Sequence, residues 1–174
     1  MWPSSGPQER TIVEWLRDRG FIEFQGPRRA TYPTFTREAV PSVLHESGLE
    51  IRRVQPDEVV RTGDPDDFFE ACLGHEGFEH FMAFDGDTAV SRAVLGIEGE
   101  LGYLGWAGTD EGHRRRGGQS ALIVARVNRA AELGCKVAVS ETLAPLYEPS
   151  IRNLEAKGFR QLYLKRVFSW GLED

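Results

Sequence analysis

The sequence predicts a mixed α/β domain whose mostly antiparallel central sheet is flanked by helices. Short alternating segments joined by tight turns at 80–84, 88–97 and 101–109 predict three consecutive antiparallel strands. A broad apolar face over 118–133 predicts a long amphipathic helix directly after them. Strand-like segments at 136–142 and 159–170 then flank a helix at 151–157, so helices and strands alternate around one sheet.

Composition restricts the class of protein before any motif is considered. The 174 residues fit one ordinary domain, and 40% hydrophobic residues, with four Trp and ten Phe, can build a substantial core. A net charge of −6 argues against nucleic-acid or membrane-surface binding. Cys72 and Cys135 provide neither a disulfide framework nor a zinc-binding spacing, so we expect no metal. Without a signal peptide or membrane span, the sequence predicts a soluble, cytoplasmic protein.

The chain divides into an N-terminal extension, residues 1–48, and a main domain, residues 49–174. The extension is expected to pack on the main sheet or extend it, to cover a substrate site, or to form a homodimer contact. Its predicted elements are a helix at 11–19, short strands at 21–24 and 30–35, and a helix at 38–47. The main domain is expected to begin with a strand at 49–54 and two short helical segments, at 56–61 and 68–73.

Two segments far apart in the chain share a pattern of helix, Gly-Phe and strand. VEWLRDRGFIEF begins at Val13 and IRNLEAKGFRQLYL begins at Ile151. The favoured interpretation is that both simply obey the chemistry that ends a helix at glycine. The alternative is that residues 10–36 are the tail of a degenerate second copy of the fold.

An arginine–glycine run immediately precedes the long helix. Arg114, Arg115 and Arg116 are followed by Gly117 and Gly118, which permit a tight turn. Unpaired N–H groups at a helix start, together with neighbouring arginines, form a site for phosphate or pyrophosphate. The alternative is a solvated basic helix start. Neither GxxxxGK[ST] nor GxGxxG is present, so a P-loop nucleotide and a Rossmann dinucleotide are both disfavoured.

In this context of strand, turn and helix, RRRGGQSAL (114–122) and SIRNLEAKGF (150–159) resemble the GNAT superfamily of N-acetyltransferases. The resemblance covers about 49–170. The first motif resembles that family's acetyl-CoA pyrophosphate loop, and the second resembles its second cofactor-side helix. Gln119 stands where the family pattern has Gly or Ala, and the resulting RxxGxQSAL loop is similar to that of a subset of the family. The resemblance implies acetyl-CoA as co-substrate.

The resemblance also implies residue roles in binding this co-substrate. The strand would present its backbone to the pantetheine arm at Trp106, Ala107, Gly108 and Thr109. Backbone N–H groups would hold the pyrophosphate at Arg116, Gly117, Gly118, Gln119 and Ser120. Arg114 and Arg115 would add positive charge, and Asn153 would approach the pantetheine or thiol end from the opposite wall.

The catalytic groups are less clearly marked. Glu141, on the strand beside the proposed cofactor site, is the first candidate for a general base, with a surface or structural carboxylate as the alternative. The family often protonates the leaving thiolate with a tyrosine, but Leu154 occupies that position here. Tyr147 is the catalytic tyrosine candidate, and Tyr163 is also near in sequence; each has a packing aromatic as its alternative.

Three histidines, His75, His80 and His113, are further acid–base candidates, although a surface or core histidine is favoured for each. A backbone N–H near Ala107 is expected to stabilise the oxyanion. The leading hypothesis is direct transfer of an acetyl group from acetyl-CoA to a primary amine of a small molecule or peptide. The alternative is a non-catalytic acyl-CoA-binding or regulatory module.

Overall fold

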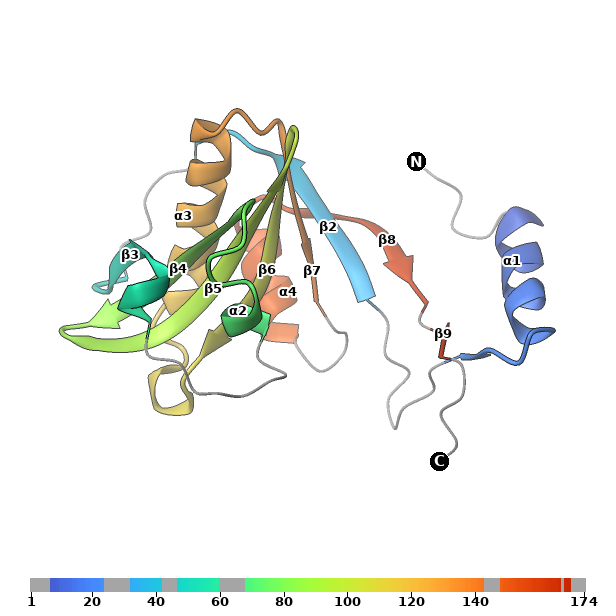
Figure 1. Cartoon of the computed structure of the whole chain (residues 1–174), viewed down its shortest axis with the longest axis horizontal. Coiled ribbons are helices and arrows are strands. Elements are labelled where there is room, and N and C mark those ends of the chain that lie inside the picture. The colour runs from blue at the N-terminus through green and yellow to red at the C-terminus, as the bar shows by residue number, and fades with distance from the viewer. Residues whose placement is uncertain are drawn as a thin grey trace.

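The computed structural model of the chain describes residues 7–23, 32–41, 47–59, 68–142, 148–166 and 168–169. Its centre is a seven-stranded sheet in the order β3-β4-β5-β6-β7-β2-β8 (Figure 1). These strands are β2 (Tyr32–Glu38), β3 (Glu50–Val54), β4 (Phe78–Asp85), β5 (Thr88–Glu98), β6 (Leu101–Thr109), β7 (Val137–Glu141) and β8 (Arg160–Lys165). All neighbours are antiparallel except β6 and β7, which are parallel. The predicted mixed α/β class with a mostly antiparallel sheet is confirmed.

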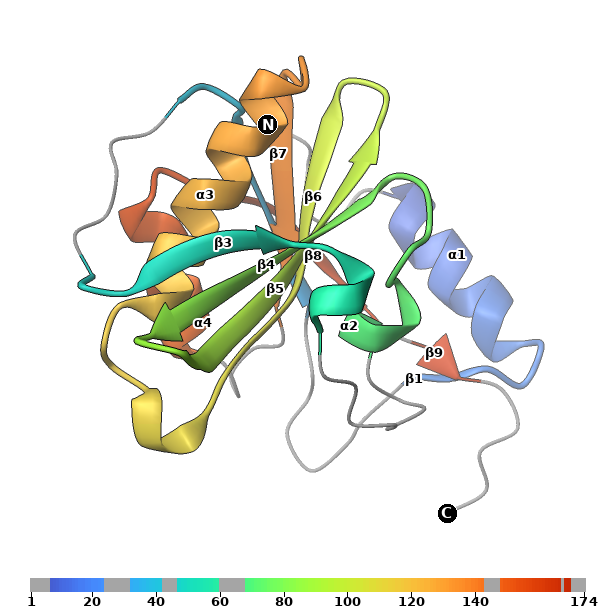
Figure 2. The ribbon, with the colours of Figure 1, turned by 60° about the vertical axis from the view of Figure 1, so that its left-hand side comes forward.

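Helices cover both faces of this sheet (Figure 2). On one side lie α3 (Gly118–Glu132) and α4 (Glu148–Ala156), whose apolar residues pack into the main core. On the other side lies α2 (Phe68–Ala71), where Phe69 and Cys72 pack against Val94 in a second, smaller cluster. Short 3-10 segments occur at Pro56–Glu58 and Glu111–His113. No helix in the described part of the chain is long and apolar enough to cross a membrane.

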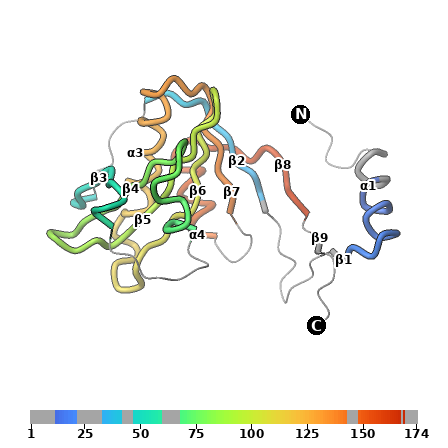
Figure 3. The backbone as a smooth tube through the Cα atoms, viewed as in Figure 1, coloured from blue at the N-terminus to red at the C-terminus, as the bar shows by residue number. Residues whose placement is uncertain are grey.

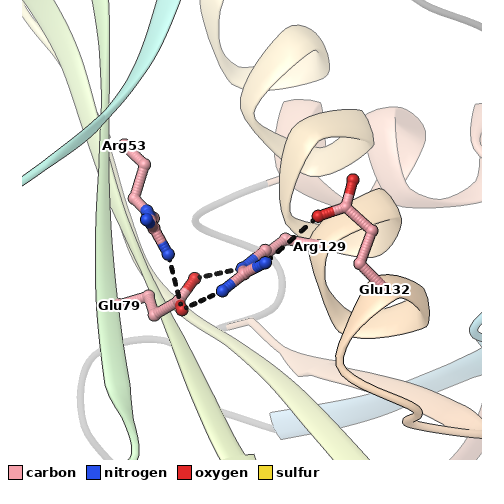
Figure 4. Close-up of polar contacts among 4 residues, drawn as sticks. All are labelled: Arg53, Glu79, Arg129 and Glu132. Atoms are coloured by element: carbon pink, nitrogen blue, oxygen red, sulfur yellow. Dashed lines mark hydrogen bonds and ion pairs between the residues drawn. The ribbon is translucent and has the colours of Figure 1, made fainter.

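A carboxylate on β4 ties α3 to the sheet (Figure 4). Glu79 accepts hydrogen bonds from Arg129 on α3, at 2.8 Å to each carboxylate oxygen, and from Arg53 on β3 at 3.0 Å. Arg129 also bonds Glu132 within the helix. The hydrogen bonds from Arg129, followed by the positive charges of Arg129 and Arg53, lower the pKa of Glu79 against the opposing effect of burial.

The N-terminal segment contributes a strand to the interior of the sheet. β2 lies between β7 and β8 and pairs antiparallel with both. The predicted helix at 38–47 is wrong at residues 38–41, because Glu38 ends β2 and residues 39–41 are not helical. Pairing on both edges of β2 outweighs the weak local helix propensity there. Residues 42–46 of that prediction lie outside the described part of the chain.

The remainder of the described N-terminal segment lies beyond β8, at one end of the molecule (Figures 1 and 3). It consists of α1 (Pro7–Arg17) and β1 (Ile22–Glu23). β1 pairs antiparallel with β9 (Phe168–Ser169) and forms a separate two-stranded sheet. Residues near the two ends of the chain therefore meet, while β2 crosses into the main sheet.

The two segments with similar sequences also have similar structures. Phe21 N–H donates to Leu16 O at 3.1 Å after α1, and Phe159 N–H donates to Leu154 O at 3.1 Å after α4. The likeness extends to the strands that follow. Ile22 and Glu23 pair with Ser169 and Phe168, and their counterparts Arg160 and Gln161 pair with Thr36 and Phe35. Helix-ending chemistry explains the shared Gly-Phe. It does not explain why the strand after each helix pairs antiparallel with a strand that follows the other segment.

Candidate active site

The parallel pair β6 and β7 separates partway along its length. Its last paired residues are Leu104 and Ser140, and the Ser140 hydroxyl donates to Leu104 O at 2.9 Å. β6 continues to Thr109, paired on its other edge with β5. Residues 105–109 therefore have one edge with no β7 partner within the described structure. This length of β6 contains the four residues that the family resemblance assigns to a pantetheine arm.

A β-bulge lies at the start of this separated length. Arg92 pairs with Gly108 and Val94 pairs with Gly105, so Trp106 and Ala107 together oppose the single residue Ala93. Trp106 has a φ of 37°, a left-handed conformation that is uncommon for a bulky side chain. Its ring meets Tyr103 edge to face, at 5.8 Å between centroids. The bulge thus directs Trp106 toward the side of the sheet on which Tyr103 lies.

A buried arginine on α3 supports the bulge from the opposite side. Arg126 is 2% exposed. Its guanidinium donates to Val94 O and Gly105 O, each at 2.9 Å, and to Leu122 O at 3.0 Å. Burial lowers the pKa of Arg126 to about 9. The bonded carbonyls come from β5, β6 and α3, so one side chain joins the elements that meet at the bulge.

The arginine–glycine run forms a tight entry to α3. Gly117 has a φ of 83° and occupies the N-cap position, with no side-chain cap. Gly118 is buried, and a Cβ there would lie 2.5 Å from the Ser91 Oγ, so the helix start closely approaches β5. An uncapped helix start leaves backbone N–H groups directed at one point, which fits a pyrophosphate.

Two arginines of the run pair with acidic side chains at the surface. Arg116 donates to Asp85 at 2.5 Å, and Arg114 lies 3.7 Å from Glu111. Arg115 has a φ of 66°. The paired side chains are between 39% and 90% exposed, and ion pairs this exposed contribute little to stability. A phosphate group can therefore compete for these arginines.

Gln119 connects the start of α3 to α4 through Ser150 and Asn153. The Gln119 amide donates to Ser150 Oγ at 2.8 Å, and Asn153 donates to Gln119 Oε1 at 2.7 Å. Ser150 and Asn153 both lie on α4. The structure thus brings together the two motifs that carried the resemblance, and it gives the Gln119 side chain a role in holding them.

Glu141 is the last residue of β7, one position beyond the final β6 partner. Thr34 on β2 donates to its Oε1 at 3.0 Å, and Lys165 on β8 forms an ion pair with the same oxygen. Tyr103 is level with Val139 in the parallel register, so Tyr103 and Glu141 share a face. Burial, and secondarily the negative charge of Glu141, raises the pKa of Tyr103.

The other acid–base candidates differ in their surroundings. Tyr147 lies outside the described residues. Leu154 is 2% exposed and packs in the main core. Tyr163 lies on the exposed strand β8 directly opposite Thr34, which is itself opposite Glu141, so Tyr163 is on the face that carries Glu141. His80 is buried and bonds Phe69 O at 3.0 Å. Desolvation lowers the pKa of His80, which is consistent with a core histidine.

Four side chains near the point where β6 and β7 separate were not predicted as functional. Thr34 and Lys165 reach Glu141 only because β2 and β8 lie beside β7, an arrangement that no local pattern predicts. Arg126 reads as a polar-face residue of an amphipathic helix, although it is buried. For Tyr103, the only sequence signal is its place on a predicted strand, which does not indicate a function. Its position, three residues before Trp106, becomes informative once the bulge is known.

The separating parallel pair, the bulged strand and the uncapped helix start all lie within the part of the chain that a family model matches. The model of the acetyltransferase (GNAT) family matches residues 45–159, more than half of the chain. The chain therefore belongs to the acetyltransferase (GNAT) family. No curated protein matches it.

Solved structures share this fold at low sequence identity. A GCN5-related N-acetyltransferase from Kribbella flavida is 15% identical to this chain, with a TM-score of 0.65. The match covers 90% of this chain and 62% of the Kribbella chain. An aminoglycoside acetyltransferase from an uncultured soil metagenomic sample, in complex with sisomicin, is 14% identical with a TM-score of 0.59, covering 74% and 99%. AAC(6')-Iy with the bisubstrate analogue CoA-S-monomethyl-acetylneamine is 22% identical with a TM-score of 0.56, covering 72% and 99%. The chain thus spans less than two thirds of the Kribbella protein.

Proposed function

We propose that this protein transfers an acetyl group from acetyl-CoA to a primary amine of a small molecule or peptide. The observation that carries the proposal is the separation of β6 from β7 beside the uncapped start of α3. A strand edge without a partner can pair with the amide groups of pantetheine. The helix start can bind the pyrophosphate at the other end of the same molecule.

Each part of the site has a distinct task in binding. Backbone N–H groups from Arg116 to Ser120 hold the pyrophosphate, and Arg114 and Arg115 add positive charge. Residues 106–109 of β6 align the pantetheine arm, and Asn153 closes the opposite side together with Gln119. The backbone N–H at Ala107, in the bulge, is assigned to the carbonyl oxygen on which negative charge develops.

Glu141 is assigned as the general base of this reaction. Both of its bonded partners use Oε1, so Oε2 is the oxygen that accepts a proton from the attacking amine, directly or through water. Acetyl-CoA supplies an acyl thioester. The amine nitrogen bonds to the acyl carbon as the C–S bond breaks, coenzyme A leaves as the thiolate, and the amine proton passes to Glu141. No general acid is assigned, because coenzyme A can leave as the thiolate.

Acetyl-CoA binding and thiol release test the proposal together. We expect acetyl-CoA to raise the melting temperature and an amine panel to release free coenzyme A. Gly117→Glu should abolish binding, because it places a carboxylate at the phosphate position. Gly134→Glu is the matched control: Gly134 has a φ of 84° with no atom near its missing Cβ, and it follows the other end of α3.

The outcomes separate the proposal from its alternatives. Binding without thiol release on a broad amine panel would favour a non-catalytic acyl-CoA-binding or regulatory module. Normal acetyl-CoA affinity in Gly117→Glu would show that the pyrophosphate binds elsewhere. If acetyl-CoA neither binds nor changes the melting temperature of the native protein, both functions are wrong.

A further inference from the structure

We infer that the acceptor of this enzyme is an amine attached through a short chain to an aromatic ring, bound against the side chains of Phe68, Tyr103 and Trp106. This inference rests on the proposed function and names the substrate class of the same site. The three side chains, here called the aromatic surface, come from α2 and from the bulged part of β6.

The aromatic surface is an ordered group of rings. Trp106 and Phe68 stack with 3.4 Å between centroids and 7° between planes, and Tyr103 meets Trp106 edge to face. Gly105 allows this arrangement, because a Cβ there would lie 3.0 Å from the Tyr103 ring. Trp106 and Phe68 are nevertheless 42% and 38% exposed. Stacked rings that remain accessible offer a binding surface to another flat apolar group.

The backbone conformation of Trp106 indicates that this exposure has a function. A bulky residue at positive φ is strained, and such strain persists only where the surrounding structure imposes it. Without the extra residue of the bulge, strand alternation would place Trp106 on the face opposite Tyr103. The bulge therefore places the ring beside the separated edge of β6, where the acyl group is proposed to lie.

Charges around the aromatic surface favour an acceptor with a single amine. Glu141 shares a face with Tyr103 and provides one carboxylate for an ammonium group. Lys165 forms an ion pair with that carboxylate. The further ammonium groups of a polycation such as an aminoglycoside would meet the positive charge of Lys165. A monoamine can bind near Glu141 while its ring stacks on Trp106.

Steady-state kinetics with three acceptors test this substrate class. We expect kcat/KM with 2-phenylethylamine to exceed that with hexylamine by about tenfold, the size of effect that one aromatic contact supplies. Kanamycin should be a poorer acceptor than either monoamine. Trp106→Leu and Phe68→Leu should each remove most of the preference for the aromatic amine, mainly through its KM. Phe68→Leu, outside the acetyl-CoA site, should change the KM for acetyl-CoA by less than about twofold.

Trp15→Leu is the matched control, because Trp15 is a 50% exposed tryptophan on α1. It should leave all three acceptors unchanged. Phe68→Leu does not alter β6, so it still tests the inference if Trp106→Leu fails to fold. Acetyl transfer with equal use of phenylethylamine and hexylamine, or a preference for kanamycin, would overturn the aromatic class and leave the proposed function intact. Absence of acetyl transfer to every amine would overturn both.

Discussion

Replacing Arg126 tests whether the bulge of β6 depends on the hydrogen bonds of one buried guanidinium. Arg126→Lys keeps a positive charge, but its side chain is shorter, so its ammonium cannot take the place of the Nη1 group that donates to both Val94 O and Gly105 O. Arg126→Met removes both the charge and the donors while keeping an unbranched apolar chain. Because the site is 2% exposed, little water is available to replace the lost donors.

The structure predicts that the lysine variant is the less stable of the two. Hydrogen bonds from a charged group contribute about 1.5–3 kcal/mol each, so losing the bonds to the two strand carbonyls costs roughly 3–6 kcal/mol in Arg126→Lys. The positive charge of the lysine stays buried, and no new hydrogen bond offsets the cost of its desolvation. Arg126→Met leaves the same carbonyls unpaired, at about 1–3 kcal/mol each, but it recovers several kcal/mol of charge desolvation. We therefore expect a net loss of about 0–3 kcal/mol for methionine.

Urea denaturation monitored by far-UV circular dichroism measures both free energies of unfolding. Arg152→Lys is the control, because Arg152 forms an ion pair with Glu148 at the surface and should change stability by less than about 0.5 kcal/mol. A lysine variant as stable as the native protein, or more stable than the methionine variant, would refute the argument. The buried guanidinium would then be replaceable by any cation.

Three further changes address the base, the link between α3 and the sheet, and packing under α3. Glu141→Gln should lower kcat at least about a hundredfold and leave acetyl-CoA affinity in calorimetry unchanged; an unchanged kcat would remove Glu141 as the base. Because Glu79 has a lowered pKa in the folded state, its stabilising effect is present above its ordinary pKa of 4.5 and is lost as pH falls through the lower folded value. The melting-temperature difference between native protein and Glu79→Gln should thus shrink on acidification from about pH 6 to pH 3, and a constant difference would contradict this. Gly102→Ala should cost about 1–3 kcal/mol in urea denaturation, because its Cβ would lie 2.8 Å from that of Ala130, whereas Gly112→Ala, in open space, should be neutral.

Local patterns predicted most of the elements in the main domain. The strands at 88–97 and 101–109 and the helix at 118–133 appear as β5, β6 and α3 with ends shifted by at most one residue. Turn glycines and hydrophobic period are local properties, so a single sequence contains them. The helix predicted from residue 38 failed because the partners of β2, on β7 and β8, lie about a hundred residues away in the chain.

The same distinction applies to the candidate site. Gly117 and the start of α3 follow from local sequence, and the structure places them as expected. The environment of Glu141 could not be predicted, because Thr34 comes from the N-terminal segment and Lys165 from the last strand of the main sheet. The bulge at Trp106 also has no local signal, since it depends on the register between β5 and β6 and on Arg126 beneath it.

The position of β2 changes how the N-terminal segment should be understood. β2 follows β1 but pairs with β8, while β9 follows β8 but pairs with β1, so the two helix–strand segments exchange their final strands. Because β2 also supplies Thr34 to Glu141, the exchanged strand is part of the site. A boundary at residue 48 would therefore divide the sheet and the environment of the proposed base.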